Sequence, residues 1–412
     1  MFGQHSSMKS GTMVLFVVTC FVLPQIAHAA ETVVHSNQPL LPTRTVELEE
    51  IWRVGGNNSD LMFGLMVNAT TDTEGRVYLM DQQLNTVTVV SPIGEVLHQI
   101  FREGDGPGEI RTPQGIALLS DGRVALAQQF PGKFIMVDSI GDPAGVITVI
   151  GGKTANEGFT ALAGCSARDG NLVVSGMFQL PADNKQSRTS YVASINPVDG
   201  TEVLRYRVHD TVLDFGKAVL IEREMVAPCY THAQGPDGRM YFARDWREYA
   251  IEVLSPDGTL EKVITRNFEP RQRTQQEKDR INELFEVQAA QMPFPITWEI
   301  EPTEQYIGGM HVDTSGTLWV SNNQSESNLP PGIFTSYDTY DTTGHWKQAV
   351  HIACEGDPAY DGLIFLNDDR VLLVKGLVLA GLTATGSQGA VFDEEGGQDE
   401  MEVICCRLKQ RD

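Results

Sequence analysis

Polar side chains suited to ligand binding are most concentrated in the stretch RDWREY. It contains Arg244, Asp245, Trp246 and Arg247. A tryptophan offers a large apolar face with one N–H donor, and the flanking guanidinium groups offer planar forks for carboxylates or sugar hydroxyls. These four residues are therefore ligand-binding candidates. The alternative is that Trp246 packs inside the protein and the charged side chains are simply solvated.

The loop REGDGPGE supplies two further ligand-binding candidates, Arg102 and Asp105. A phosphate loop needs glycines followed by a helix N-terminus with a cation directed at the anion. Here Asp105 and Glu109 crowd the glycines, and an apolar strand and an Asp-Gly turn follow. The glycines therefore indicate backbone bends rather than a phosphate site. Three amides near expected strand ends complete the set of ligand-binding candidates: Gln114, Asn322 and Asn323.

Two histidines could supply a metal site or an acid–base pair. His232 and His311 precede the glycines of two turns by six and five residues. Strand alternation then directs them to opposite faces, which counts against a shared ion. Asn68 could add an amide, so these three residues are the candidates for a divalent metal, calcium or zinc. The sequence has no GxSxG, HExxH or DxDxDG motif, and catalytic residues stay unassigned.

A repeated β-pattern must position these residues. Six phrases recur, each with a short apolar segment, a turn, and a strand rich in β-branched or aromatic residues. Successive turn markers are 47, 48, 68, 78 and 53 residues apart, at Gly75, Gly122, Gly170, Gly238, Gly316 and Asp369. Intervals near fifty residues indicate about four short strands per unit. We predict an all-β, six-bladed β-propeller of four-stranded antiparallel blades, with residues 44–408 forming the propeller.

The pattern also predicts how the blades are connected. The Asp-Gly turns should lie on one face, and the loops that carry most candidates on the other. We expect strands near both ends of the chain to share a blade, because an open ring would expose two sheet edges. A helix over about 271–292, between blades four and five, begins at the capping box Thr274 and Glu277. It could act as a lid over the central cavity or as a clip on the outer rim.

The N-terminus has the features of a secretory signal peptide. Lys9, an apolar core and the end Ala27-His28-Ala29 predict cleavage after Ala29, leaving residues 30–43 as a flexible segment. No later segment approaches the ~18 apolar residues of a transmembrane helix. The expected location is therefore secreted or periplasmic. The 54 acidic against 31 basic residues disfavour nucleic acid as a partner.

Cysteine spacing leaves the disulfide pattern open. Five cysteines follow the signal peptide, namely Cys165, Cys229, Cys354, Cys405 and Cys406. They show no CxxC metal spacing, and at most two bridges could form in an oxidising compartment. The adjacent pair Cys405-Cys406 could form a strained disulfide, but ordinary strand residues are the favoured interpretation.

The phrase GDGPGEIRTPQGIALLSDGRV resembles the secreted bacterial six-bladed β-propellers related to NHL repeats. Ile110 replaces the Phe that is commoner in them, and the resemblance extends roughly from Thr45 to Cys406. It implies the fold but not the function, since this architecture hosts both binding modules and enzymes. We expect a binding or protein-interaction module that uses the loop-rich face. The alternative is a metal-assisted hydrolase or lyase with its ion in the channel, acting on a lactone, peptide or sugar derivative.

Overall fold

The structure is a computed structural model that describes residues 32–57, 59–149, 158–183, 185–214, 219–225, 230–290, 295–384 and 400–410. The chain divides into two compact units, Met1–Glu31 and Thr32–Asp412, and all described residues belong to the second unit. The predicted signal peptide and Cys229 lie outside the described residues. Within them, strands predominate and only three helices occur.

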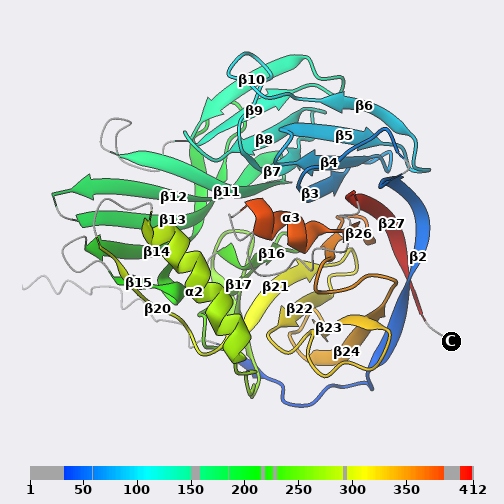
Figure 1. Cartoon of the computed structure of the whole chain (residues 1–412), viewed down its shortest axis with the longest axis vertical. Helices are drawn as coiled ribbons and strands as arrows, with labels where there is room; N and C mark the ends of the chain where they lie inside the picture. The colour runs from blue at the N-terminus through cyan, green and yellow to red at the C-terminus, as the bar shows by residue number, and fades with distance from the viewer. Residues whose placement is uncertain are drawn as a thin grey trace, which may run out of the picture. The chain divides into compact units, whose positions relative to one another are not determined.

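Three four-stranded antiparallel sheets follow one another in the first half of the chain (Figure 1). In each sheet the strands lie side by side in chain order. The first sheet contains β3 (Met66–Thr71), β4 (Val77–Asp81), β5 (Thr86–Val90) and β6 (Val96–Ile100). The second contains β7 (Pro113–Leu118), β8 (Val124–Gln128), β9 (Lys133–Val137) and β10 (Pro143–Thr148). The third contains β11 (Phe159–Arg168), β12 (Asn171–Ala182), β13 (Lys185–Ile195) and β14 (Glu202–Asp214).

The fourth sheet has a strand that the sequence did not predict. It contains β16 (His232–Gln234), β17 (Met240–Ala243), β18 (Ala250–Leu254), β19 (Leu260–Thr265) and β1 (Val33–His35). β1 runs parallel to β19 and covers its outer edge. Within residues 30–43, which the sequence predicts to be flexible, Val33–His35 is a strand. An exposed sheet edge has unpaired N–H and C=O groups, and a short segment with β-branched residues satisfies them.

The remaining sheet is eight-stranded and joins the two ends of the described chain. One half of this sheet contains four strands that are consecutive in the chain: β21 (Ile307–Val312), β22 (Leu318–Asn322), β23 (Ile333–Tyr340) and β24 (Trp346–Ala353). The other four are β2 (Arg44–Gly55), β27 (Glu402–Gln410), β26 (Arg370–Lys375) and β25 (Gly362–Phe365). β2 pairs with β27 over nine positions, which confirms that strands from the two ends share a sheet.

The fold is all-β and propeller-like, but the structure does not contain six separate sheets. β2 also pairs in parallel with β24 over four residues. This pairing joins two antiparallel groups into the eight-stranded sheet. The sequence pattern did not reveal it, because periodicity identifies strands but not the edge that each strand selects.

The first strands of the repeated units surround one central cavity. β3, β7, β11, β16, β21 and β25 each lie at the end of a sheet, and all six contribute residues to the lining. We call this space, of about 410 Å³, the channel cavity. Buried apolar clusters fill the space between neighbouring sheets. One of them joins Tyr78 and Val89 of the first sheet to Leu126 and Ile135 of the second.

The turns between first and second strands gather on one face, as predicted. Turns of the first, second and third sheets and of β25–β26 line one cavity of about 640 Å³, the turn-side cavity. Hydrogen bonds connect neighbouring turns: Thr71 N–H donates to Asn367 Oδ1 at 2.9 Å, and Thr314 N–H donates to Asp369 Oδ1 at 2.8 Å. These contacts fix the order of the sheets around the channel cavity.

A helical insertion follows β19 and lies beside a short two-stranded sheet. α2 (Gln275–Ala290) begins at the predicted capping box, in which the Thr274 N–H donates to Glu277 Oε2 at 2.7 Å. The two-stranded sheet pairs β15 (Val219–Ile221) with β20 (Thr297–Glu299). Phe285 of α2 is buried and stacks on Trp298 of β20, with ring centroids 6.2 Å apart. α2 is therefore attached to the insertion's own strands. α1 (Glu222–Met225) and α3 (Leu377–Ala384) are further helices (Figure 1).

Trp52 should be essential for stability because it packs where both ends of the chain meet. It is 4% exposed, lies in a cluster with Met66 and Cys405, and contacts Gly94, where a Cβ would stand 2.5 Å from Trp52 Cβ. Replacing a buried tryptophan with alanine costs about 3–5 kcal/mol. We expect Trp52→Ala to lower the free energy of unfolding by this amount in urea titrations. The exposed Ile93→Ala is the control. A Trp52→Ala loss equal to that of the control would contradict the assignment.

Candidate functional site

A polar cavity of about 460 Å³ lies on the loop side of the fourth and eight-stranded sheets. We call it the loop-side cavity. Four connecting segments form it: the loop after β17, the segment between β19 and α2, the segment leading into β21, and the loop after β22. Its lining residues are Trp246, Arg271, Arg273, Glu304, Gln305, Gly308, Ser321, Asn322, Asn323, Ser325, Glu326 and Ser327.

The loop-side cavity brings together three of the predicted ligand-binding candidates, Trp246, Asn322 and Asn323. Sequence reasoning missed its charged residues, which are Arg271, Arg273, Glu304 and Glu326. The sequence marks two of them only by the RQR stretch immediately before the capping box. Charged residues are common next to the start of a helix, so this stretch did not indicate a binding site.

Two guanidinium groups in the wall of the loop-side cavity are already paired. Arg271 donates two parallel hydrogen bonds to Glu277 at 2.9 and 3.0 Å, and it lies 3.9 Å from Glu304. Arg273 is buried and donates to both carboxylate oxygens of Glu222 at 2.7 and 2.9 Å. Bidentate pairs of this kind fix the position of the side chain. Both arginines therefore shape the wall rather than await an anion.

Glu326 differs from the other charged residues of the loop-side cavity. Among the residues that the structure describes, none forms a hydrogen bond or ion pair with its carboxylate. Enclosure by protein raises the pKa of Glu326, the nearby Glu304 carboxylate raises this pKa further, and Arg271 opposes the shift. The Glu326 side chain is nevertheless exposed, so water reaches its carboxylate and reduces this penalty.

Trp246 serves mainly as a structural anchor. It is 7% exposed, and its indole N–H donates to the Thr303 carbonyl at 3.3 Å. The backbone N–H of Tyr306 donates to the Trp246 carbonyl at 2.9 Å. These bonds hold the segment that leads into β21 against the loop after β17. Trp246 also lines the loop-side cavity.

The charged neighbours of Trp246 are engaged by other residues. Arg244 donates to the buried Glu252 at 3.0 Å, and Arg247 donates to the buried Glu301 at 2.8 Å. Asp245 accepts a hydrogen bond from the Arg247 backbone N–H at 3.1 Å. The structure places all three beside Trp246, but none of them lines the loop-side cavity.

Asn322 and Asn323 hold neighbouring structure as well as lining the loop-side cavity. The side-chain amide of Asn322 donates to Asp338 Oδ2 at 2.8 Å. Asn323 Oδ1 accepts the Arg271 backbone N–H at 3.3 Å. Asp81, at the end of the second strand of the first sheet, likewise binds the backbone of an approaching loop. It accepts the backbone N–H groups of Gly64 and Leu65 at 2.7 and 3.2 Å. Such residues capture the approaching loop.

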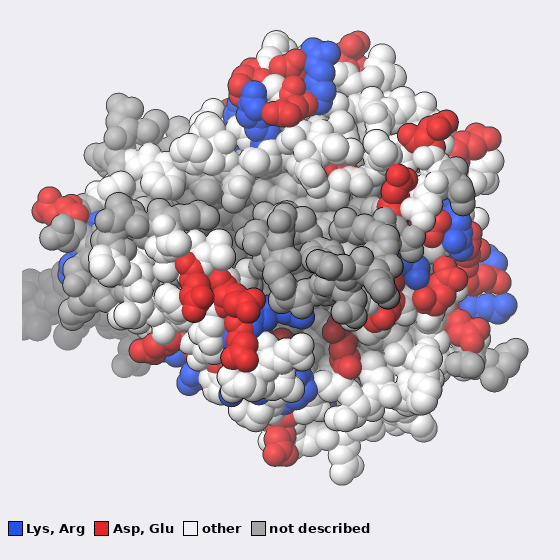
Figure 2. Space-filling view, viewed as in Figure 1, with Lys and Arg blue, Asp and Glu red and all other residues white. Residues whose placement is uncertain are grey.

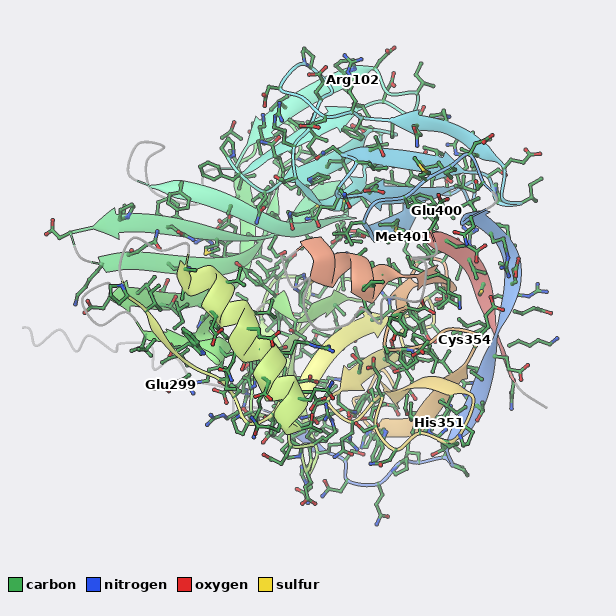
Figure 3. All side chains as sticks on the ribbon, viewed as in Figure 1. Arg102, Glu299, His351, Cys354, Glu400 and Met401 are labelled. Atoms are coloured by element: carbon green, nitrogen blue, oxygen red, sulfur yellow. The ribbon has the colours of Figure 1, made fainter. Side chains whose placement is uncertain are left out.

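The remaining ligand-binding candidates lie away from the loop-side cavity. Arg102 is exposed and donates to Glu109 at 2.8 Å, and Asp105 accepts from Arg111 at 3.2 Å (Figure 3). The Gly106 N–H, which a phosphate would require, donates instead to Glu109 at 2.8 Å. Both donors lower the pKa of Glu109, Gly106 more strongly than Arg102. Gln114 lies on β7 and lines neither the channel cavity nor the loop-side cavity.

The two histidines face different neighbours. His311 lines the channel cavity and stacks on Phe365 of β25 at 4.9 Å. Burial lowers its pKa, and its Nε2 has no hydrogen-bond partner among the described residues. His232 stacks on Phe242 at 5.5 Å, and its Nδ1 lies 3.1 Å from the Tyr230 carbonyl oxygen. Phe242 packs against residues of the third sheet. Asn68 lines the channel cavity with His311.

The described residues include no group of three or more His, Cys, Asp or Glu side chains that could hold a metal ion. The four described cysteines, Cys165, Cys354, Cys405 and Cys406, are free thiols. Burial raises the pKa of Cys406 to about 12, so this thiol is unreactive at neutral pH. No helix among the described segments has the length and apolar character needed to cross a membrane.

Comparison with solved structures finds similar chains at low identity. A putative exported protein from Bacteroides fragilis is 11% identical, with a TM-score of 0.47, and the match covers 92% of this chain and 100% of that one. A calcium-binding protein, regucalcin, from Agrobacterium tumefaciens is 12% identical, with a TM-score of 0.41 and coverage of 90% and 97%. Virginiamycin B lyase from Staphylococcus aureus is 10% identical, with a TM-score of 0.41 and coverage of 86% and 98%.

No protein-family model and no curated protein sequence matches this chain. At TM-scores below 0.5, the similarities to solved structures carry no argument about its function. The functional argument therefore depends on the residues of the cavities.

A buried ion pair next to the loop-side cavity should stabilise the two sheets that form it. Arg266 contacts Asp338 at 2.8 Å and lies over the rings of Tyr249 and Trp346, 4.5 and 4.4 Å from their centroids. Removing one partner of a buried pair costs about 3–5 kcal/mol, because the other charge stays buried. We expect this loss for Arg266→Met in chemical unfolding.

The double variant Arg266→Met, Asp338→Asn should lose less than the sum of its single variants, because it removes both charges. The exposed Arg102→Met serves as the control and should change stability by less than about 1 kcal/mol. Additive losses in the double variant would show that the two side chains do not interact.

Proposed function

We propose that this protein is a secreted or periplasmic, six-bladed propeller that binds a small ligand in its loop-side cavity. The sequence features of residues 1–29 support the location, although they lie outside the described residues. The six-bladed arrangement is supported by six first strands around the channel cavity. On this interpretation the eight-stranded sheet is two blades joined by the four-residue pairing of β2 with β24.

The observation that carries the proposal is the loop-side cavity itself. Its volume of about 460 Å³ suits a small molecule, and its wall combines an apolar indole with amides, hydroxyls and carboxylates. Rigid elements position this wall, since Trp246, Arg271 and Arg273 are held by hydrogen bonds to neighbouring segments. A preformed wall reduces the entropy cost of binding.

The turn-side cavity is larger but is a poorer candidate. Its carboxylates are used within their own turns. Asp72 accepts backbone N–H groups from Glu74 and Arg76 at 2.9 Å each, and it also pairs with the Arg76 guanidinium at 2.6 Å. Asp368 pairs with Arg370 at 2.6 Å in the same way. Groups that are engaged within their own turns have less capacity to recognise a ligand, whereas the exposed Glu326 of the loop-side cavity has no hydrogen-bond partner among the described residues.

A larger side chain inside the loop-side cavity should weaken ligand binding without unfolding the protein. A Cβ added at Gly308 would stand 3.6 Å from Ser321 Oγ, an ordinary contact, and Gly308 has no positive φ. We expect Gly308→Leu to weaken binding by at least about tenfold, equivalent to about 1.4 kcal/mol. The measurement is a thermal-shift screen of organic amines, carboxylic acids and sugars, followed by calorimetry on each ligand found.

Gly381→Leu is the matched control, because no atom lies within 4 Å of a Cβ added in α3. It should keep full binding. Equal ligand affinity in Gly308→Leu and the control, or no binding of any of the three ligand classes, would refute the loop-side cavity as the site.

The second proposed function is a metal-assisted hydrolase or lyase that acts in the channel cavity on a lactone, peptide or sugar derivative. His311 Nε2, which has no hydrogen-bond partner among the described residues, favours it. The described donors do not fit a metal centre: His311, Asp313, Asn68, Gln234 and Asn367 line the cavity, but the described residues include no group of three His, Cys, Asp or Glu side chains that could hold zinc or calcium. No reaction step is therefore derived for this channel.

Metal content separates the two proposals. For the binding module we expect purified protein to contain no stoichiometric calcium or zinc in elemental analysis. Its melting temperature should also stay unchanged on chelation, because no folding energy depends on a metal. Stoichiometric metal, together with a melting temperature that falls on chelation and is restored by the same metal, would instead support the hydrolase or lyase.

A further inference from the structure

We infer that the outer edge of β14 is a docking site for an extended, cationic segment of another protein, which pairs with it as an added strand. This inference goes beyond the proposed function, because no residue of β14 lines the loop-side cavity. Three features of the described residues support it: the length and regularity of the edge, the covering of other edges by this chain, and the side chains that the edge exposes.

β14 has the longest free outer edge among the described sheets. It lies last in the order of the third sheet, and no described strand pairs with its outer side (Figure 1). It spans 13 residues, whereas β6 and β10, whose outer edges are also free, span 5 and 6. A long free edge provides a row of backbone donors and acceptors to which an extended segment can pair.

The second half of β14 lacks the features that usually protect a sheet edge, which are bulges, prolines and lysines. β6 and β10 each have a register shift against the neighbouring strand, and β10 also begins at Pro143. In β14 both register shifts lie before Arg207, and residues 207–214 pair with β13 without interruption. These residues include no proline, glycine or lysine. The outer side of 207–214 therefore has the regular spacing that an added strand requires.

This chain already covers two of its other outer edges by adding a strand. β1 pairs in parallel with β19 at three positions, and β2 pairs in parallel with β24 at four. Main-chain hydrogen bonds supply the affinity in such pairings, and the side chains that alternate along the edge supply the specificity. The uninterrupted part of β14 is longer than either pairing, so it offers more main-chain hydrogen bonds to an added segment.

The side chains on one face of this edge define the chemistry of the partner. Val208, Asp210 and Val212 point to the same face, because side chains alternate along a regular strand. The two valines are 43% and 63% exposed, and Asp210 is exposed between them. Asp210 accepts a hydrogen bond from the Thr189 hydroxyl at 2.6 Å but forms no ion pair with a described residue. An aliphatic residue opposite each valine and a lysine or arginine opposite Asp210 complement this pattern.

A second copy of this chain fits the edge less well than a cationic segment. Each copy has 54 acidic against 31 basic residues, so two copies repel each other at low salt. Two-fold antiparallel pairing centred on Asp210 would also place two carboxylates opposite each other, which destabilises a sheet. Figure 2 shows several groups of acidic side chains on this view of the surface, and such groups attract a basic partner.

The test uses the peptide KTVTKTVTK, labelled with a fluorophore at its N-terminus, and the full mature protein at low salt. The sequence is palindromic, so it presents a lysine between two valines in either strand direction. We expect saturable binding in fluorescence anisotropy and slower amide hydrogen exchange in residues 207–214. The control peptide KTVPKTPTK has the same charge, but its prolines remove an N–H donor from each side of the strand. It should not bind.

Val212→Lys should weaken binding of the peptide KTVTKTVTK. It places a lysine on the free edge, where the lysine repels the cationic peptide and hinders strand pairing. We expect the affinity to fall by at least about fivefold, equivalent to about 1 kcal/mol. Val198→Lys is the matched control, because Val198 is 79% exposed and precedes β14 in the chain. It adds the same charge elsewhere and should keep full affinity, and both variants should melt at the temperature of the parent protein.

Several results would overturn the inference. Absence of binding by KTVTKTVTK would exclude the cationic segment, and equal binding of the two peptides would show attraction to the acidic surface without strand pairing. Equal affinity in Val212→Lys and Val198→Lys, or unchanged exchange in 207–214, would place the peptide elsewhere. A dimer in analytical ultracentrifugation that Val212→Lys dissociates, without peptide binding, would show that a second copy covers the edge.

Discussion

The need to cover exposed sheet edges organises this structure. Each repeated unit ends in an outer strand with one free edge, and in the described sheets the outer edges of β6, β10 and β14 gain no further strand, whereas those of β19 and β24 do. β1 pairs with β19 and β2 pairs with β24, so segments near the N-terminus cover two of these edges. β2 also pairs with β27 over nine positions and so connects the two ends of the described chain. These pairings connect repeated units whose first strands line the channel cavity.

Most of the negative charge outside the loop-side cavity has a structural use. Aspartates in the turns cap their own backbone: Asp313 Oδ1 accepts N–H groups from Ser315 and Thr317 at 3.0 and 2.9 Å, and Asp341 accepts from Thr343 and His345 at 2.9 and 3.0 Å. An acidic composition therefore follows in part from the repeated turns. The acidic composition is therefore weak evidence about the charge of any ligand.

The loop-side cavity differs from its surroundings in how completely its charges are satisfied. Next to it, Asp338 receives hydrogen bonds or ion pairs from Tyr249, Asn322 and Arg266, each at 2.8 Å. Glu301 is likewise shared between Arg223 and Arg247 at 2.9 and 2.8 Å. These networks hold the loops around the cavity, whereas the exposed Glu326 has no hydrogen-bond or ion-pair partner among the described residues. The loop-side cavity is therefore a space whose wall is held by satisfied polar networks, as a preformed binding site requires.

The sequence by itself determined the local structure, namely the strands, the turns that separate them and the capping box of α2. Alternation, turn residues and capping depend on neighbours within a few positions, so they can be found without the fold. Tertiary structure decided which strand covers which edge, and it made residues 30–43 partly a strand. It also decided that Trp246 and Asn322 are both anchors and cavity walls, while Arg102 and Gln114 lie elsewhere. Glu326 and Arg271 are 55 residues apart in the chain. Their proximity depends on packing between units, and no local pattern encodes it.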